Sequence, residues 1–169
     1  MRVKGKVLKV GSNIDTDVII PGRYLIIDNP LELAKHAFEP IYPGFTEKAR
    51  EGVVLVAGRN FGCGSSREQA PLALKHAGVK AIIAESFARI FFRNSVNIGL
   101  PVLVLKDSQR NFNEGDRVEI DLDKGIIENI TKKERFQIKP LHSMVKEILE
   151  QGGLINYLKR KHLKRADLK

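Results

Sequence analysis

Residues 58–69 concentrate the residue types that bind and transform anions. They read Gly-Arg-Asn-Phe-Gly-Cys-Gly-Ser-Ser-Arg-Glu-Gln, with three glycines, two serines and two arginines between an apolar run and a helical pattern. In parallel sheets, ligands bind beyond the carboxyl ends of the strands. Glycines there expose backbone N–H groups, and a helix N-terminus adds about half a positive charge. The segment therefore predicts a site for an anionic substrate, with Gly64 among the residues that let a ligand approach the backbone.

Ser65 and Arg67 suit one reaction type in particular, the removal of a proton next to a carboxylate. A serine hydroxyl is a poor base at its free pKa. Helix-start N–H groups and a neighbouring guanidinium would stabilise its alkoxide, and the same guanidinium binds a carboxylate through two parallel hydrogen bonds. The four histidines lie in ordinary helical contexts, so the sequence does not indicate a Ser-His-Asp hydrolase.

The same segment has two other interpretations. Ser65 with Glu68, or Ser66 with Gln69, has the spacing of a capping box, in which the hydroxyl caps a helix. That alternative leaves Arg67 and the three glycines unexplained. A strand, glycine loop and helix also suit a nucleotide- or phosphate-binding module. The glycine spacing, however, does not match G-x-G-x-x-G, and no Gly-Lys-Ser/Thr ending follows.

A second polar cluster, Asp15-Thr16-Asp17, lies in a loop nearer the N-terminus. Such residues usually make Asx turns or begin a helix. Two acids are a weak functional signal by themselves.

Hydrophobic patterning places both clusters on an α/β scaffold with a mixed sheet. Short apolar runs rich in β-branched residues predict buried strands, and helical spacing of apolar residues predicts the helices between them. The central elements alternate as βαβαβ, which predicts parallel pairing, and a later alternating pattern predicts an antiparallel meander. The predicted strands are residues 3–9, 53–57, 80–84, 101–105, 118–122, 126–130 and 135–138. The predicted helices are residues 31–38, 66–77, 86–97, 142–150 and 154–163, with Pro71 moving the regular start of the second toward Ala70.

Length and composition indicate one domain over residues 1–169. The chain has 169 residues, 43% of them hydrophobic, which is enough for one buried core. Every apolar block is far shorter than the roughly 20 residues of a membrane span, so we expect no membrane association. The single cysteine, Cys63, cannot by itself form an intrachain disulfide or hold a zinc or iron–sulfur site, which points to a reducing cytoplasm.

The charge is concentrated at the C-terminus. The net charge is +9, and residues 157–169 hold six lysines and arginines against one acid, Asp167. A basic run without interleaved aromatic residues beyond Tyr157 is more typical of a solvated helix end than of a nucleic-acid reader. We therefore expect a basic helical tail and no nucleic-acid partner, with tail-mediated binding as the weaker hypothesis.

Together, the two polar segments resemble the small subunit, or swivelling domain, of the aconitase superfamily. The resemblance covers essentially the whole chain. The ending Gly-Gly-Leu-Ile-Asn-Tyr at 152–157 is similar to that of the short small subunits of 3-isopropylmalate dehydratase and homoaconitate hydratase. The matching residues are Asp15-Thr16-Asp17-Val18-Ile19, Pro21-Gly22-Arg23-Tyr24-Leu25, residues 58–68, Ser86-Phe87-Ala88-Arg89-Ile90, Arg93-Asn94, Asn97 and Gly99.

The resemblance implies a three-layer β/β/α fold and a hydro-lyase that is active only with a separate large subunit carrying a 4Fe-4S cluster. It implies that Ser65 is the base on the substrate carbon, that Arg67 grips a carboxylate and that Asp17 helps at the hydroxyl or water. Ser66 would support the anion through its backbone, and this chain would bind no metal. The implied reaction isomerises 2-isopropylmalate and 3-isopropylmalate through isopropylmaleate in leucine biosynthesis, with homoaconitate hydration as the alternative.

Substrate choice is expected in the loop after Tyr24 and Leu25, where similar enzymes place a cation for a further carboxylate. Ile26 and Ile27 stand there instead. An apolar pair suits an isopropyl group and would leave a third carboxylate buried without a partner. This favours isopropylmalate. Arg23 is close in sequence, which leaves dual specificity open.

Overall fold

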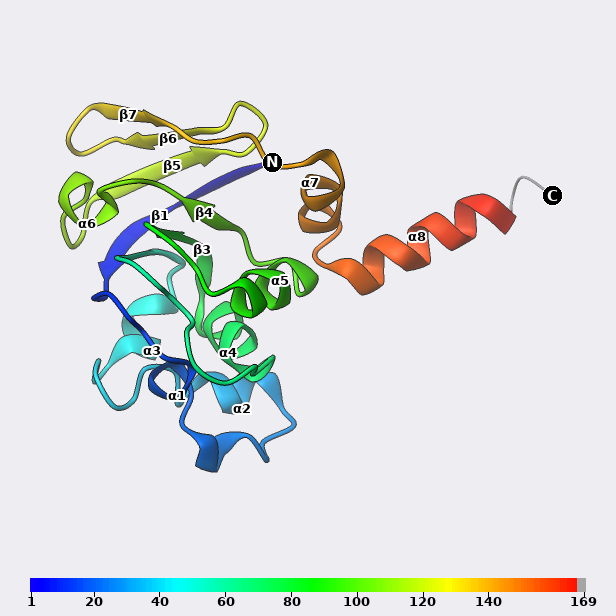
Figure 1. The fold of residues 1–169 in the computed structure, drawn as a ribbon, viewed down its shortest axis with the longest axis horizontal. Helices are drawn as coiled ribbons and strands as arrows, with labels where there is room; N and C mark the ends of the chain where they lie inside the picture. The colour runs from blue at the N-terminus through cyan, green and yellow to red at the C-terminus, as the bar shows by residue number, and fades with distance from the viewer. Residues whose placement is uncertain (167–169) are drawn as a thin grey trace.

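A single mixed sheet organises the chain in the computed structural model, which describes residues 1–166 and, of residues 164–166, the backbone alone. Its seven strands are β1 (Arg2–Lys9), β2 (Val53–Ala57), β3 (Val79–Ala84), β4 (Val102–Val104), β5 (Arg117–Asp121), β6 (Ile126–Asn129) and β7 (Glu134–Gln137). They lie in the order β4-β3-β2-β1-β5-β6-β7 (Figure 1). Neighbours from β4 to β1 pair in parallel, and neighbours from β1 to β7 pair antiparallel. The predicted parallel core and antiparallel meander are confirmed.

Helices and turns connect these strands. Most lie between β1 and β4, and two follow β7. They are α1 (Thr16–Ile19), the 3-10 turn η1 (Gly22–Tyr24), α2 (Pro30–Ala34), α3 (Phe45–Ala49), α4 (Gln69–Ala77), α5 (Arg89–Asn97), α6 (Ser108–Asn111), α7 (Ser143–Glu150) and α8 (Leu154–Ala166).

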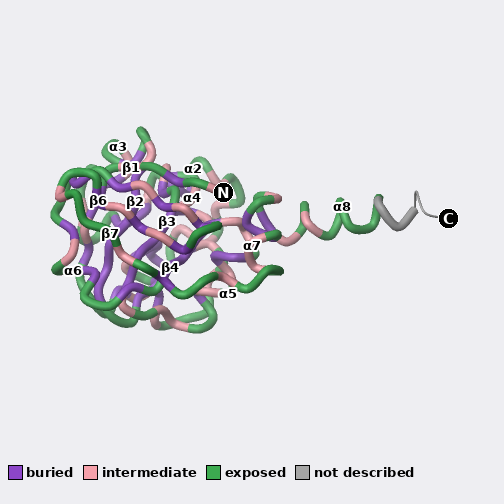
Figure 2. The backbone as a smooth tube through the Cα atoms, turned by 90° about the horizontal axis from the view of Figure 1, so that it is seen from above, coloured by how far each residue is buried: buried purple, intermediate pink, exposed green. Residues whose placement is uncertain are grey.

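The two faces of β2 pack into separate hydrophobic cores. All five residues of β2 are buried. Leu55 lies in a core with apolar residues from α1 to α5, whereas Val54 lies in a second core with Ile120 of β5 and Ile127 of β6. This division follows from the pleat, because successive side chains of a strand point to opposite faces. The predicted β/β/α layering is thus confirmed: helices, parallel strands, and a meander that curls over the opposite face (Figures 1 and 2).

Three predicted helices differ from the structure at their ends. α4 begins at Gln69, near the start that Pro71 required, and Gly78 at φ 117° ends it as predicted. α5 begins at Arg89 rather than at residue 86, because residues 86–88 bond to the loop after β2. The helix predicted over residues 31–38 ends at Ala34, since the chain turns to bury Phe38 in the core at φ 56°.

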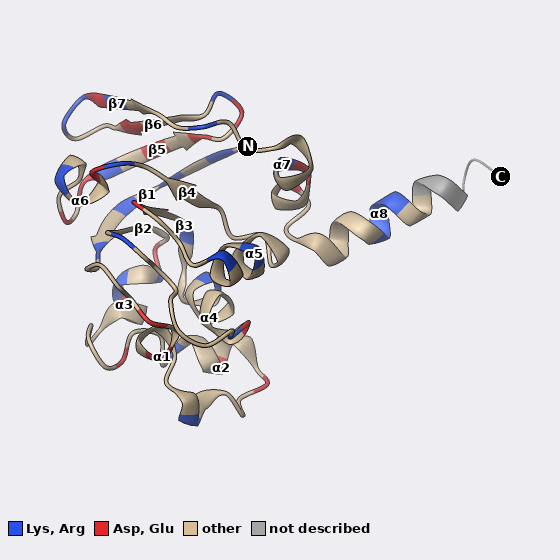
Figure 3. Cartoon of the chain, viewed as in Figure 1, with Lys and Arg blue, Asp and Glu red and all other residues tan. Residues whose placement is uncertain are grey.

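Helix α8 extends away from the body of the molecule (Figures 1 and 2). It contacts α5 and α7, and leaves Ile155 and Leu163 exposed. Basic residues lie along it (Figure 3). The basic tail predicted over residues 157–169 is helical as far as Ala166, and residues 167–169 lie outside the described part of the chain. Among the described residues, no helix combines the length and apolar character needed to cross a membrane.

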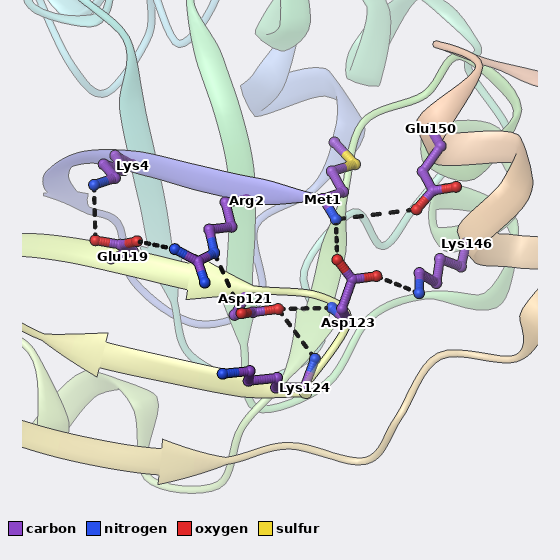
Figure 4. A network of polar contacts seen from close by, with 9 residues as sticks. All are labelled: Met1, Arg2, Lys4, Glu119, Asp121, Asp123, Lys124, Lys146 and Glu150. Carbon is purple, nitrogen blue, oxygen red and sulfur yellow. Dashed lines mark hydrogen bonds and ion pairs between the residues drawn. The ribbon is translucent and has the colours of Figure 1, made fainter.

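A network of charges links the meander to helix α7 (Figure 4). Asp123, in the turn between β5 and β6, accepts hydrogen bonds from the amine of Met1 and from the Lys146 side chain of α7. These two donors lower the pKa of the Asp123 carboxyl to about 2, with the Lys146 hydrogen bond as the larger cause. The ionised form of Asp123 therefore ties α7 to the sheet.

This ion network predicts a pH-dependent contribution to stability. The pKa of Asp123 is about 2 in the folded chain against an ordinary value of 3.8. The stabilisation is therefore complete above about pH 4 and is lost as the pH falls toward 2. Asp123→Asn should lower the urea midpoint at pH 7, and the difference from wild type should shrink between pH 4 and pH 2. Asp28→Asn is the matched control, because Asp28 is exposed and makes no ion pair within residues 1–166. A difference that stays constant with pH would contradict this account.

Candidate active site

Three loops meet at the carboxyl ends of β1, β2 and β3. The backbone of the loop after β2 lies between the other two. On one side Gly62 donates to the carbonyl of Ile14 at 2.8 Å, and Thr16 donates to that of Cys63 at 2.9 Å. On the other side, Ala88 donates to the carbonyl of Phe61 at 2.9 Å. The fold thus brings the Asp15-Thr16-Asp17 cluster directly beside the glycine-rich segment.

Asp15 and Thr16 hold the first two loops in place. The Asp15 carboxylate caps α1 by accepting a hydrogen bond from the Asp17 N–H at 2.8 Å. The Thr16 hydroxyl donates to the carbonyl of Ser65 at 3.0 Å. Gly64, at φ +87°, lies against the Asp15 carboxylate so closely that a Cβ there would be 2.2 Å from its Oδ2 atom. Asp15 therefore performs the helix-starting role that the sequence allowed, and Asp17 is left for another contact.

That contact is an ion pair between Asp17 and Arg67. Nη1 of Arg67 lies 2.5 Å from Oδ1 of Asp17 and also donates to the carbonyl of Ile20 at 3.2 Å. The Arg67 side chain is 15% exposed, whereas that of Asp17 is 57% exposed. Within residues 1–166, the Nη2 group of Arg67 has no acceptor. Asp17 thus fixes the guanidinium and leaves part of its donor fork available to a ligand.

Neither serine of the glycine-rich segment caps the following helix. The residue before α4 is Glu68, and no side chain caps that end. Ser65 and Ser66 are exposed, and neither hydroxyl makes a hydrogen bond to a described residue. The backbone N–H groups of Ser66, Arg67 and Glu68 also lack acceptors in the part of the chain that is described. The capping-box alternative is therefore wrong, and the loop presents uncommitted donors around the Ser65 hydroxyl.

A pocket of about 360 Å³ lies between these loops and α5. It contains Ser65, Gly64 and Arg67 but not Asp17, Ser66, Ile26 or Ile27. Residues 89, 90 and 94 are part of the resemblance, but the sequence analysis assigns them no role. In the structure they form the α5 side of the pocket. The available signal was their position in the helix that follows the third parallel strand, with Arg89 and Ile90 at its start and Asn94 one turn later. The full lining is Thr16, Gly62, Gly64, Ser65, Arg67, Ala88, Arg89, Ile90, Phe91 and Asn94.

The predicted specificity residues lie nearer the N-terminus, just after η1. Ile26 is 86% exposed, and Ile27 packs partly against the helix-side core. Arg23 is engaged with Glu39 at 3.3 Å and lies over the Tyr24 ring, with 4.7 Å from its Cζ to the ring centroid. Ile26 thus presents an apolar side chain to whatever covers this surface.

Comparison with known proteins identifies the family of the chain. The Aconitase C-terminal domain family matches residues 2–108. A protein from Thermodesulfovibrio yellowstonii named 3-isopropylmalate dehydratase small subunit is 50% identical over 169 residues, covering all of both chains. This chain belongs to the 3-isopropylmalate dehydratase small-subunit family. The 3-isopropylmalate dehydratase small subunit 1 of Archaeoglobus fulgidus is 55% identical over 155 residues, 92% of this chain and 96% of the relative. A crystal structure of 3-isopropylmalate dehydratase from Methanocaldococcus jannaschii is 47% identical, with a TM-score of 0.94 and full coverage of both chains.

Membership of the 3-isopropylmalate dehydratase small-subunit family confirms the predicted superfamily and its fold. The roles of Ser65, Arg67 and Asp17 stay predictions that the geometry makes specific. Among residues 1–166, no group of three or more histidine, cysteine or acidic side chains is arranged to hold a metal ion. Cys63 is a free, partly exposed thiol.

A larger hollow of about 820 Å³ lies away from these loops, near the amino end of β2. Its lining carries as many carboxylates as cations, and two ion pairs form there: Lys4 lies 2.9 Å from Glu119, and Lys6 lies 3.9 Å from Glu51. Such mutually neutralised surface pairs offer little to a small anion. The smaller pocket, with its uncommitted hydroxyl and guanidinium, is the better candidate active site.

The close packing of Gly64 on Asp15 predicts that the two loops separate when a side chain is added. Gly64→Ala places a Cβ against a carboxylate and forces alanine into a left-handed conformation. We expect the free energy of unfolding to fall by at least about 1 kcal/mol in urea denaturation. Gly11→Ala is the control, because a Cβ at Gly11 meets nothing within 4 Å. Equal losses in the two variants would show that the loop contact contributes nothing specific.

Proposed function

We propose that this chain is the small subunit of a hydro-lyase that interconverts 2-isopropylmalate and 3-isopropylmalate through isopropylmaleate in leucine biosynthesis, and that it binds the substrate carboxylate and supplies the base. The observation that carries the proposal is the exposed Ser65 hydroxyl, beside the Arg67 guanidinium that Asp17 holds in place. The relatives named 3-isopropylmalate dehydratase small subunit support it at 50–55% identity.

Ser65 is the proposed base. Its Oγ atom, as an alkoxide, takes the proton from the carbon next to the carboxylate. The electron pair of that C–H bond becomes the new double bond, and the neighbouring C–O bond breaks. The hydroxyl leaves with a proton as water, and the reverse steps on the other carbon complete the isomerisation. The free N–H groups of Ser66 and Arg67 and the Arg67 charge stabilise the alkoxide that this chemistry requires.

Arg67 and Asp17 have the proposed roles of binding and orientation. Arg67 holds the carboxylate with the donors that Asp17 leaves free, so the acidic carbon lies next to Ser65. Asp17 is largely exposed on the same surface and is positioned to exchange a proton with the departing hydroxyl or the returning water. Gly64 and Ser66 contribute backbone at the pocket edge.

The open side of this surface is the proposed docking face for a large subunit. The relatives are named small subunits, which implies a larger partner. The proposed partner carries a 4Fe-4S cluster, whose iron supplies Lewis-acid activation of the substrate hydroxyl when bound. The residues of this chain do not suit the cluster themselves, because one cysteine falls short of the required thiolates. A reducing cytoplasm is the compartment that we propose for such a pair, and neither nucleic acid nor a membrane is a proposed partner.

The proposed role of Ile26 and Ile27 is to contact the isopropyl group once the partner covers them. Ile26 is exposed, so the contact depends on the assembled enzyme. The alternative substrate is homoaconitate, whose third carboxylate would need a cation at this position. Arg23 is engaged with Glu39 and Tyr24, which favours the monoalkyl diacid over the tricarboxylate.

The Ser65 proposal predicts a large loss of activity with the fold intact. Ser65→Ala, reconstituted with the large subunit without oxygen, should hydrate isopropylmaleate about 10²- to 10⁴-fold more slowly in kcat, because the proton acceptor is gone. Ser143→Ala is the control, since Ser143 is an exposed residue of α7 outside the pocket. Full activity in Ser65→Ala would remove serine from the mechanism.

The specificity proposal predicts that a cation at residue 26 changes the preferred acid. Ile26→Arg should lower kcat/KM for isopropylmalate and raise it for the tricarboxylate homoaconitate, changing the ratio about tenfold or more. Lys106→Arg is a suitable control for added guanidinium, because it lies in the loop after β4, away from η1. An unchanged ratio would show that substrate choice lies elsewhere.

A further inference from the structure

The Asn94 side chain lines the active-site pocket and carries an unused hydrogen-bond donor. Its Nδ2 atom is buried and has no hydrogen-bond partner, the one such side-chain atom among the described residues. Asn94 belongs to α5 and lines the pocket of about 360 Å³ together with Ser65 and Arg67. Buried polar groups in folded proteins almost always have partners, and one without a partner destabilises the chain that contains it. This donor therefore calls for an acceptor that the free chain does not supply.

The surroundings identify the acceptor as an anion. The lining includes two guanidinium groups, Arg67 and Arg89, and no carboxylate. Arg89 is exposed, and no ion pair or hydrogen bond of its side chain is found within residues 1–166. Arg89 is also the first residue of α5, so the partial positive charge of that helix end adds to the same field. Arg67 is already paired with Asp17, but a neutral ligand would leave the Arg89 guanidinium without a counter-charge, whereas a carboxylate satisfies both that charge and the Asn94 donor.

We propose that Asn94 donates a hydrogen bond through Nδ2 to the substrate carboxylate that Arg67 binds, a role that rests on the proposed function of the site. A carboxylate oxygen has two lone pairs, so one group accepts from Arg67 on the loop side and from Asn94 on the helix side. Binding from two directions fixes the rotation of the carboxylate, which a single guanidinium does not. It also fixes the carbon next to the carboxylate relative to Ser65. Asn94 is thus a substrate-binding residue whose donor remains unpaired until the substrate arrives.

Two variants separate this role from a structural one. Asn94→Leu removes the donor and keeps the branched shape in a larger side chain. Asn94→Asp keeps the size and shape but replaces the donor by a negative charge that repels a carboxylate. In the reconstituted enzyme, kcat/KM for isopropylmalate should fall about 10- to 100-fold in Asn94→Leu, mainly through KM, and further in Asn94→Asp. The isolated Asn94→Leu chain should unfold at the same urea concentration as wild type or a higher one, because an unpaired buried donor has been removed. Asn97→Leu, at an exposed position of the same helix, is the control for kcat/KM.

The outcomes distinguish the two proposals. An active wild-type pair with kcat/KM unchanged within about twofold in both Asn94 variants would overturn the role of Asn94 and leave the proposed function standing. A lower urea midpoint for both variants, with unchanged KM, would show that Asn94 is structural. A wild-type pair that fails to hydrate isopropylmaleate while Ser65→Ala behaves identically would overturn the proposed function and the role of Asn94 with it.

Discussion

The parallel pairing of β1 with β2 is the constraint on which the site depends. The two strands run side by side with Leu8 opposite Leu55, so the chain leaves both at the same edge of the sheet. The loops that follow continue the pairing beyond the strands, with Thr16 bonded to Cys63 and Gly62 to Ile14. Because of this register, Asp17 and Arg67, 50 residues apart in sequence, meet at 2.5 Å. Strand pairing thus places the acid of the first loop beside the guanidinium of the second.

The same edge receives the loop after β3, which completes the pocket. Ala88 bonds to Phe61, and α5 begins at the next residue. The three loops therefore contribute different groups: an acid comes from the first, a hydroxyl and a guanidinium from the second, and an amide from the helix after the third. The pocket holds donors in excess of acceptors, which suits an anionic substrate delivered from outside. Such a site has a cost in stability, because its donors stay unpaired until a ligand arrives.

Much of the architecture could be predicted from the sequence. The continuous apolar run of β2 and the alternation of residues 118–122 distinguish a strand covered on both faces from the strands of a meander, and both predictions are confirmed. Ser65 and Arg67 were identified from residue type, and the resemblance pointed to Asp17. What the sequence could not show was geometry between distant residues. The spacing S-x-x-E is the same whether or not the serine hydroxyl bonds to the helix start, so the sequence could not decide whether a serine caps α4. It also gave Asn94 no role, because burial of its Nδ2 atom depends on the packing of α5. The early end of α2 was missed for the same reason, since only the core shows where Phe38 must go.

Helix α8 has a consequence for how the molecule unfolds. It touches only α5 and α7 among the helices and strands that make substantial contacts with it, and its apolar residues Ile155 and Leu163 face solvent. A helix of 13 residues with so few tertiary contacts is near the length at which helix formation in water is marginal. Its amide protons therefore exchange through local fraying, while those of β2 exchange only through global opening. The C-terminal extension and the sheet are thus two cooperative units of different stability, and a surface that covers α8 would merge them into one.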